Sequence, residues 1–355
     1  MVRQSDLAIR LGSARVDTYS AELIYSFYGN WAGGRSKPAG ERGAVSRAAT
    51  SKAAAEAQRL HAHGRVLARP VTNLMLDELA RLIEQFEGDY LMSLIDLSII
   101  QATRPTGNPE VDDTRAISAL AIGRALGLPY ETCRRKVRDL EAAGLCRRVS
   151  TNRLAVARGR LENPAYRAQC DARWRNLRLY LVELRDIGFD LNEFGEVSPQ
   201  TAVKAPNLSR TIAWLMDDFI LRMQEARITN EEDAFNSLVM TALSNMNGET
   251  LRADRELTWM YAGGDTPPPD SLRTPVTIAM LARRVKISED VIGRRVNAYL
   301  QRGWISRVHG GYMHVMAKQV SAEAHESRNL MNLRFLQFVQ ALRLLGVDPA
   351  TVTAD

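Results

Sequence analysis

The 355-residue chain has little of what enzyme chemistry usually requires. It contains three cysteines, an odd number with no CxxC spacing, so we expect reduced, structural thiols. It contains five histidines, and His309 and His314 have no cysteine or carboxylate at ligand spacing, so we expect no metal site. The GxxxxGK[ST] phosphate loop is also absent. We therefore expect a protein that is not an enzyme and has no cofactor.

Long hydrophobic runs are absent as well. No window approaches the roughly 20 uncharged apolar residues that a membrane-spanning helix needs. The first residues, MVRQSDLAIRLGSAR, lack the apolar core of a signal peptide, so we expect a cytoplasmic protein without a membrane partner. With 45% hydrophobic and 25% charged residues, the chain can build two globular cores.

The net charge of +6 is unevenly distributed along the chain. Residues 1–70 carry net +6, residues 71–114 net −7, residues 115–160 net +8, and residues 274–318 net +6. Basic islands of this kind favour a polyanionic partner, and nucleic acid is the commonest one in the cytosol. The alternative is a pair of solvated basic helices without a partner.

The chain also resembles itself. The segment ISALAIGRALGLPYETCRRKVRDLEAAGLCRRV from Ile117 aligns without a gap with VTIAMLARRVKISEDVIGRRVNAYLQRGWISRV from Val276. Flanking segments match in the same order on both sides. The sequence therefore predicts a duplicated helical unit. A partly flexible basic arm (1–70) comes first, followed by a first repeat (71–194) with its basic island at about 115–157. A linker (195–209) then leads to a second repeat (210–350) with its basic island at about 274–316.

Each basic island predicts two helices followed by a hairpin. In the first, Gly127 ends one helix, and a second helix with apolar Cys133, Val137 and Leu140 ends at Gly144. The following LCRRV-STN-RLAV predicts two short strands around a polar tip. The stretch GLPYETCRRKVRDLEAAGLCRRV resembles bacterial winged helix-turn-helix regulators of the GntR, MarR and Crp types, and the second island resembles a diverged copy. The predicted fold is therefore mainly α, with two winged-helix modules.

The resemblance implies that the second helix of each module enters the major groove of DNA. Opposite the apolar stripe of the first module lie Arg135 and Arg138, whose guanidinium groups suit guanine. The same face of the second module carries Arg294, Asn297 and Gln301, and the amides suit adenine. The other expected DNA contacts, several of them to phosphates from the wings, are Tyr130, Thr132, Arg134, Arg147, Arg148, Arg153, Arg295, Arg307 and His309. Alternatively, the helix arginines pair with acidic neighbours. The second module could instead bind DNA more weakly than the first or serve as a partner-binding surface.

These features predict a sequence-specific double-stranded DNA-binding protein, a transcriptional regulator whose two modules act as a pseudo-dimer on an asymmetric site. A plasmid-type replication initiator and a protein-interaction scaffold with degenerate winged helices are the alternatives. A homodimer, and contact with RNA polymerase or another protein, stay open. The basic arm either follows DNA phosphates or docks as a helix over residues 46–67 on the acidic segment.

Overall fold

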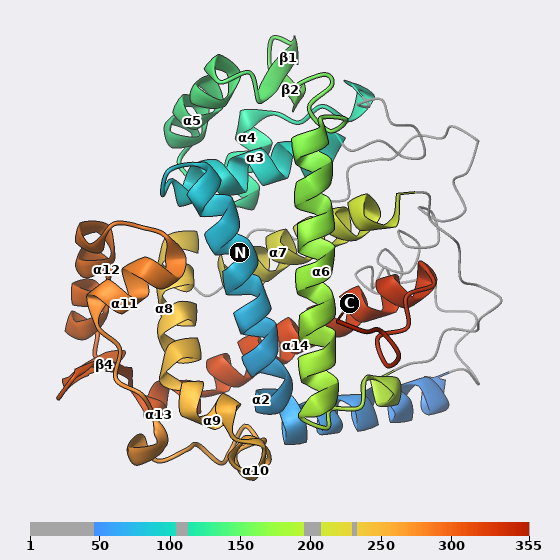
Figure 1. The fold of residues 1–355 in the computed structure, drawn as a ribbon. Helices are drawn as coiled ribbons and strands as arrows, with labels where there is room; N and C mark the ends of the chain where they lie inside the picture. The colour runs from blue at the N-terminus through green and yellow to red at the C-terminus, as the bar shows by residue number, and fades with distance from the viewer. Residues whose placement is uncertain (1–45, 104–112, 195–206, 229–232, 355) are drawn as a thin grey trace.

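The structure is a computed structural model that describes residues 46–103, 113–194, 207–228 and 233–354. It is mainly helical, which confirms the predicted class, and its strands form two short antiparallel hairpins (Figure 1). The first half contains α2 (Ser46–Gln85), α3 (Tyr90–Thr103), α4 (Ala119–Ala125), α5 (Tyr130–Ala142), β1 (Cys146–Ser150), β2 (Arg153–Val156) and α6 (Pro164–Asp186). The second half contains α7 (Leu208–Ile228), α8 (Ala234–Asn247), α9 (Glu249–Ala253), α10 (Arg255–Met260), α11 (Ile278–Val285), α12 (Glu289–Gln301), β3 (Ile305–Val308), β4 (Gly311–His314), α13 (Met316–Gln319) and α14 (Ala322–Leu344).

Helix α2 continues through the boundary that the sequence suggested at residue 70. Pro70 lies inside this helix. Figure 1 shows that α2 changes direction near its middle. Two hydrogen bonds between backbone groups of α2 and other segments accompany this bend. The amide of Arg65 donates to the Ala262 carbonyl at 2.9 Å, and the Asn332 side chain donates to the Gly64 carbonyl at 3.0 Å. Contacts from distant segments thus satisfy backbone groups at the bend. Residues 1–45 of the predicted arm lie outside the described residues.

Four long helices, α2, α6, α7 and α14, pack against one another at the centre of the molecule (Figure 1). An ion cluster joins three of them. The Arg173 guanidinium of α6 donates to Glu78 of α2 at 2.7 Å and lies 2.7 Å from the carboxylate of Asp217 of α7. All three side chains are less than a tenth exposed. Burial raises the pKa of Asp217. Burial lowers the pKa of Arg173, but the carboxylates of Asp217 and Glu78 raise it by more than burial lowers it, so the pKa lies above the usual range.

Two helix–helix–hairpin segments flank this centre. In one, α4 packs on α5 and the β1–β2 hairpin follows; in the other, α11 packs on α12 and the β3–β4 hairpin follows. A residue ahead of the first helix adds a short third strand to each hairpin, because Ile117 bridges Leu154 and Val276 bridges Tyr312. The segments pack on α3 and α8, respectively.

Several helices that occupy the same place in the order of the two halves have equal or nearly equal lengths, and the pair among them that differs is α4 with 7 residues and α11 with 8. Helices α3 and α8 have 14 residues each, α5 and α12 have 13 each, and α6 and α14 have 23 each. The loop after the second helix of each segment begins with a glycine in the left-handed region, at φ 68° for Gly144 and 66° for Gly303. Glycine is favoured there because a Cβ atom would strain the backbone. The predicted linker lies outside the described residues as far as residue 206.

The main apolar core extends from the bundle into both flanking segments, and Ile100, Val156 and Leu161 form a second, smaller cluster. Cys133, Cys146 and Cys170 are buried and unpaired. Burial raises the pKa of Cys133 to about 11 and that of Cys146 to about 12, which leaves unreactive thiols and agrees with a structural role. None of the helices in the described ranges is long and apolar enough to cross a lipid bilayer.

Candidate nucleic-acid interface

Helix α5 has one buried and one exposed face. Cys133, Val137 and Leu140 are buried, as their spacing predicts. They pack the helix on α4 and α3, so the opposite face lies in solvent. Arg135 and Arg138 lie on this exposed face, and neither makes a hydrogen bond or ion pair with any residue that the structure describes. Both guanidinium groups therefore keep their full hydrogen-bonding capacity for a partner.

Other residues at the start of α5 are less available. Arg134 is exposed, but its Nε and Nη2 atoms both contact the Oε2 atom of Glu131, at 3.0 and 2.9 Å. Tyr130 is 46% exposed, and Thr132 is half-buried. An arginine that is paired within its own helix presents less net charge than the sequence suggests, so Arg134 is a weaker candidate than Arg135 or Arg138.

The arginines of the first hairpin are engaged within the protein. Arg147 forms an ion pair with Asp113 and therefore presents less free charge to a phosphate than the sequence suggests. Arg148 donates to Glu141 at 2.8 Å and to the Thr151 carbonyl at 3.1 Å, and Arg153 donates to the Ala116 carbonyl at 2.8 Å. Residues 113, 116 and 141 lie outside the hairpin, so tertiary contacts decided these pairings. Arg148 and Arg153 remain exposed, and part of each guanidinium can still face a phosphate.

Helix α12 presents a less basic face. Ile292, Val296 and Tyr299 are buried against its own segment and α8. The expected contacts that are exposed and lack a described partner are Arg294, Asn297, Gln301 and, at the second hairpin, Arg307 and His309. The exposed carboxylates of Glu289 and Asp290 lie in the first turn of the same helix. This face therefore offers amides and one arginine beside two acidic groups.

Arg295 is engaged with α8 and is therefore a weaker candidate for a DNA contact than Arg294. The Arg295 guanidinium bonds Asp233 at 2.8 Å and lies 5.0 Å from the centre of the Phe235 ring, so it fastens α12 to the start of α8. Lys136 of α5 forms the corresponding ion pair with Asp89 at the start of α3. Spacing along the helix placed Arg295 beside Arg294, but the packing of α8 determined where its side chain lies.

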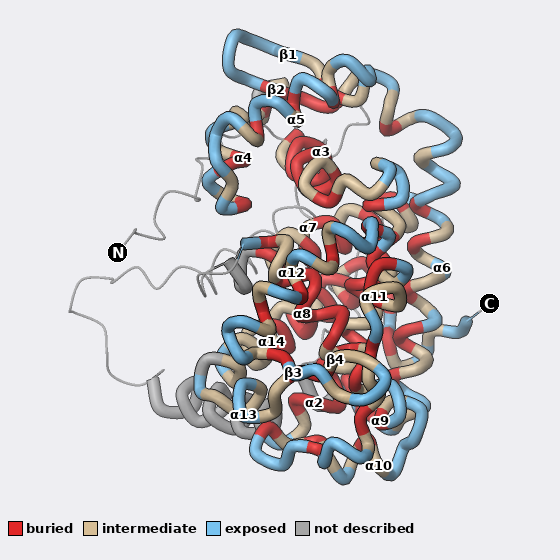
Figure 2. The backbone as a smooth tube through the Cα atoms, turned by 90° about the vertical axis from the view of Figure 1, so that its left-hand side faces the viewer, coloured by how far each residue is buried: buried red, intermediate tan, exposed pale blue. Residues whose placement is uncertain are grey.

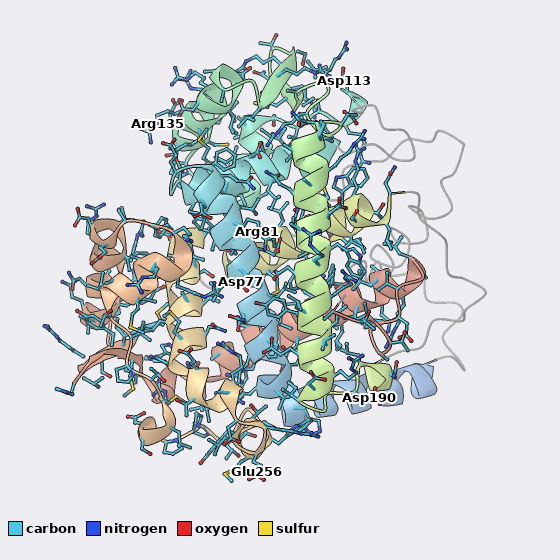
Figure 3. All side chains as sticks on the ribbon, viewed as in Figure 1. Asp77, Arg81, Asp113, Arg135, Asp190 and Glu256 are labelled. Carbon is cyan, nitrogen blue, oxygen red and sulfur yellow. The ribbon has the colours of Figure 1, made fainter. Side chains whose placement is uncertain are left out.

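The two segments lie on one side of the molecule. Figure 2 shows α4, α5 and the first hairpin above α11 and α12, with exposed backbone on the viewer's side. Both segments also lie toward the left in Figure 1. Figure 3 places Arg135 at the outer edge of α5.

Sequence reasoning missed a second group of basic residues. Arg65 and Arg69 of α2, Arg273 and Arg328 come from three distant parts of the chain, yet all four line one cavity between α2, α8 and α14. No sequence motif marks them, because they come together only in the tertiary structure. Among the described residues, no group of three or more His, Cys, Asp or Glu side chains could hold a metal ion.

Comparison of the chain with protein-family models, with curated proteins and with solved structures finds no match.

Proposed function

We propose that the chain is an internal duplication that carries two winged-helix modules, residues 115–157 and 274–316. The equal or nearly equal helix lengths support this proposal, and so do contacts that recur at corresponding positions. Lys136 pairs with Asp89, and Arg295 pairs with Asp233. Both acidic residues also accept a hydrogen bond from a backbone amide in the first turn of the following helix, so the same device fixes α5 on α3 and α12 on α8.

A second recurrent contact joins each hairpin to its supporting helix. The Val156 amide donates to the Thr103 hydroxyl at 3.2 Å, and the His314 amide donates to the Asn247 side chain at 3.0 Å. Thr103 and Asn247 are the last residues of α3 and α8. Two unrelated helical segments have no reason to share such buried side-chain contacts, whereas two copies of one ancestral unit do.

The proposed function is sequence-specific binding of double-stranded DNA, with α5 in a major groove. The observation that carries it is the unpaired, exposed pair Arg135 and Arg138 on the face opposite a buried apolar stripe. Arginine is the side chain best suited to bidentate recognition of guanine in this groove. Other helix arginines in this region, Arg134 and Arg295, have acidic partners. Arg135 and Arg138 are thus the two arginines of α5 without an internal partner among the described residues, and Arg294 is the arginine of α12 in the same state.

The two modules differ, so we propose a pseudo-dimer that reads an asymmetric site and acts as a transcriptional regulator. The face of α12 carries Arg294, Asn297 and Gln301, of which the amides favour adenine. The position of both faces on one side of the chain supports engagement of a single duplex. The carboxylates of Glu289 and Asp290 oppose phosphate, so the second module contributes less affinity than the first.

The test is selection of bound fragments from genomic DNA, followed by footprinting of the best site. We expect two unlike protected half-sites, with Arg135→Ala weakening one and Asn297→Ala weakening the other. The matched control is Arg175→Ala, which removes an exposed arginine from α6. Binding to random duplex should also fall steeply with salt. Absence of salt-dependent binding would reject DNA as the partner and favour a protein-interaction role, and protection of one palindrome by two chains would reject the pseudo-dimer.

A further inference from the structure

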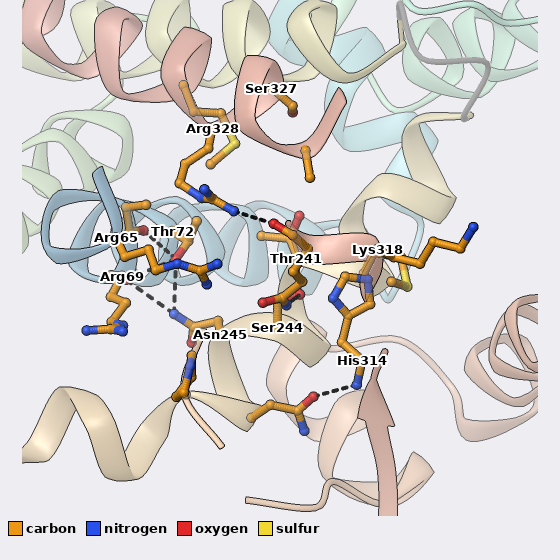
Figure 4. A pocket seen from close by; sticks show the side chains of 18 of the residues that line it. Arg65, Arg69, Thr72, Thr241, Ser244, Asn245, His314, Lys318, Ser327 and Arg328 are labelled. Carbon is orange, nitrogen blue, oxygen red and sulfur yellow. Dashed lines mark hydrogen bonds between the residues drawn. The ribbon is translucent and has the colours of Figure 1, made fainter. Parts of the chain in front are cut away.

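A cavity of about 750 Å³ opens between the second half of the chain and α2. Residues of α2, α8 and α9 form its walls together with the end of the second hairpin, α13 and the first turns of α14 (Figure 4). This volume is in the range of small-molecule binding sites. The cavity lies away from the exposed faces of α5 and α12, since no residue of either helix lines it.

The lining of this cavity is strongly basic. It contains Arg65, Arg69, Arg273, Arg328 and Lys318, and no aspartate or glutamate. Arg65 donates to the carbonyls of residues 263 and 264, Arg69 to those of residues 258 and 261, and Arg328 to that of residue 319. Among the described residues, Arg273 forms an ion pair with Asp270, whose side chain is 70% exposed. The carboxylate of Asp265, which does not line the cavity, interacts electrostatically with Arg65 and Arg328. Backbone carbonyls orient these guanidinium groups but do not neutralise their charge.

Gathering these charges has an electrostatic cost. Burial, followed by the nearby Arg328 and Arg273, lowers the pKa of Arg65 to about 10. Burial and the neighbouring arginines likewise lower the pKa of Arg69 and Arg328 to about 10. All three remain protonated at neutral pH, so the cavity holds like charges close together. An anion in the cavity would relieve this repulsion.

Two further groups in the cavity can receive an anion. His314 is 8% exposed, and its Nδ1 atom has no hydrogen-bond partner in the described part of the chain. Burial and then Arg273 lower the pKa of His314 to about 4, so the ring is neutral and can donate from one nitrogen. Ser321 lines the cavity as the N-cap of the 23-residue α14, whose N-terminal end carries partial positive charge.

In the first half of the chain, a carboxylate neutralises the cation at the position that corresponds to this cavity. There, Arg160 forms a bidentate pair with Asp96 at 2.6 and 2.7 Å. The shift of 158 residues that superposes α6 on α14 places Lys318 at the position of Arg160. The shift of 144 residues that superposes α3 on α8 places Met240 at the position of Asp96. Both Lys318 and Met240 line the cavity, so the second half keeps the cation and lacks its counter-ion.

We propose that this cavity is a binding site for a small phosphate-bearing polyanion with two or more negative charges. Guanidinium groups bind phosphate oxygens through paired, charge-assisted hydrogen bonds, and a lysine ammonium group binds them as a point charge. The proposal goes beyond DNA binding and does not depend on it, because no residue of the proposed DNA-reading helices takes part. It also gives a role to the basic residues of α2 that the sequence assigned to a DNA-tracking arm.

The experiment uses the full chain with pyrophosphate, ATP or citrate at constant ionic strength. Isothermal titration calorimetry and thermal melting should show binding of pyrophosphate or ATP and an increase in Tm, with citrate weaker. Comparison of pyrophosphate with ATP distinguishes an inorganic ligand from a nucleotide. Arg328→Gln and Lys318→Met should each weaken binding at least about tenfold, because each removes a charged hydrogen-bond donor. The control Arg175→Gln removes an exposed arginine elsewhere and should bind as the unmodified protein does.

Three results would overturn the proposal. The first is no heat and no Tm increase with either phosphate probe up to about 10 mM. The second is undiminished binding in both variants, and the third is citrate binding as tightly as the phosphates do. Lys318 is exposed, so its variant should fold even if Arg328→Gln does not, and circular dichroism checks both. The salt dependence of DNA binding is measured separately, so failure at one site is distinguishable from failure at the other.

Discussion

The buried ion cluster at the centre of the bundle makes a sharp prediction about stability. Arg173 is the only cation that contacts both Glu78 and Asp217 in the described structure, and the two carboxylate side chains are 3% and 2% exposed. Arg173→Met keeps most of the apolar side-chain volume but removes the positive charge. Breaking a buried pair by removing one partner costs about 3 to 5 kcal/mol, because the remaining charge is left unpaired. Here Asp217 loses its ion-pair partner, while Glu78 keeps an ion pair with Arg81 at 3.1 Å, so we expect a loss of about 3 to 5 kcal/mol at pH 7.

The pH dependence of this loss identifies its cause. Burial already raises the pKa of Asp217, and without Arg173 the pKa should rise further. Acidification then protonates Asp217 in the folded variant, so the destabilisation should be smaller at pH 5 than at pH 8. Urea unfolding followed by circular dichroism measures both values. The triple variant Arg173→Met, Glu78→Gln, Asp217→Asn should recover much of the loss, because no unpaired buried carboxylate remains.

The control for the cluster is Arg175→Met, which removes an exposed arginine two residues away on the same helix. It should change the free energy of unfolding by less than about 0.5 kcal/mol. A loss below about 1 kcal/mol for Arg173→Met, or a loss that does not vary with pH, would refute the view that this cluster holds two buried, ionised carboxylates.

The other predictions concern the proposed interface, the N-terminal residues and His314. Arg135→Ala or Arg138→Ala should cost about 1 to 3 kcal/mol on the best DNA site in fluorescence anisotropy, with Tm unchanged; an equal loss on random duplex would make the residue a phosphate contact. Removal of residues 1–45 should weaken binding to every duplex. It should also reduce the slope of the log binding constant against log salt concentration by about 0.9 for each DNA phosphate that the shortened chain no longer neutralises, and an unchanged slope would contradict this prediction. His314 has a folded-state pKa of about 4, against an ordinary value of 6.5, so on acidification the unfolded chain takes up the proton before the folded protein does. Lowering the pH from about 6.5 to about 4 should therefore remove up to about 3 kcal/mol of stability. His314→Gln should lose that part of the pH dependence in urea unfolding, and an identical profile would show that another group causes it.

Local patterns in the sequence were sufficient for the helical class and for the faces of its amphipathic helices. The spacing of Cys133, Val137 and Leu140 fixed the buried side of α5, because residues three and four apart share one face of a helix. That same rule left Arg135 and Arg138 on the opposite side, where the structure has them exposed. These outcomes depend on neighbours within about one helical turn, so the sequence could determine them without knowledge of the fold.

The partners of the charged side chains were decided by tertiary structure. Arg147 and Arg295 look as available as Arg138 in the sequence, but packing brings Asp113 to one and Asp233 to the other. The basic cavity has the same origin, since Arg65 and Arg328 belong to helices at opposite ends of the described chain. The strength of an ion pair depends on a separation of a few ångströms and on burial, and neither follows from residue type or local spacing. Residue order thus determined which charges the protein carries, and the packing of α2, α8 and α14 determined which of them remain uncompensated.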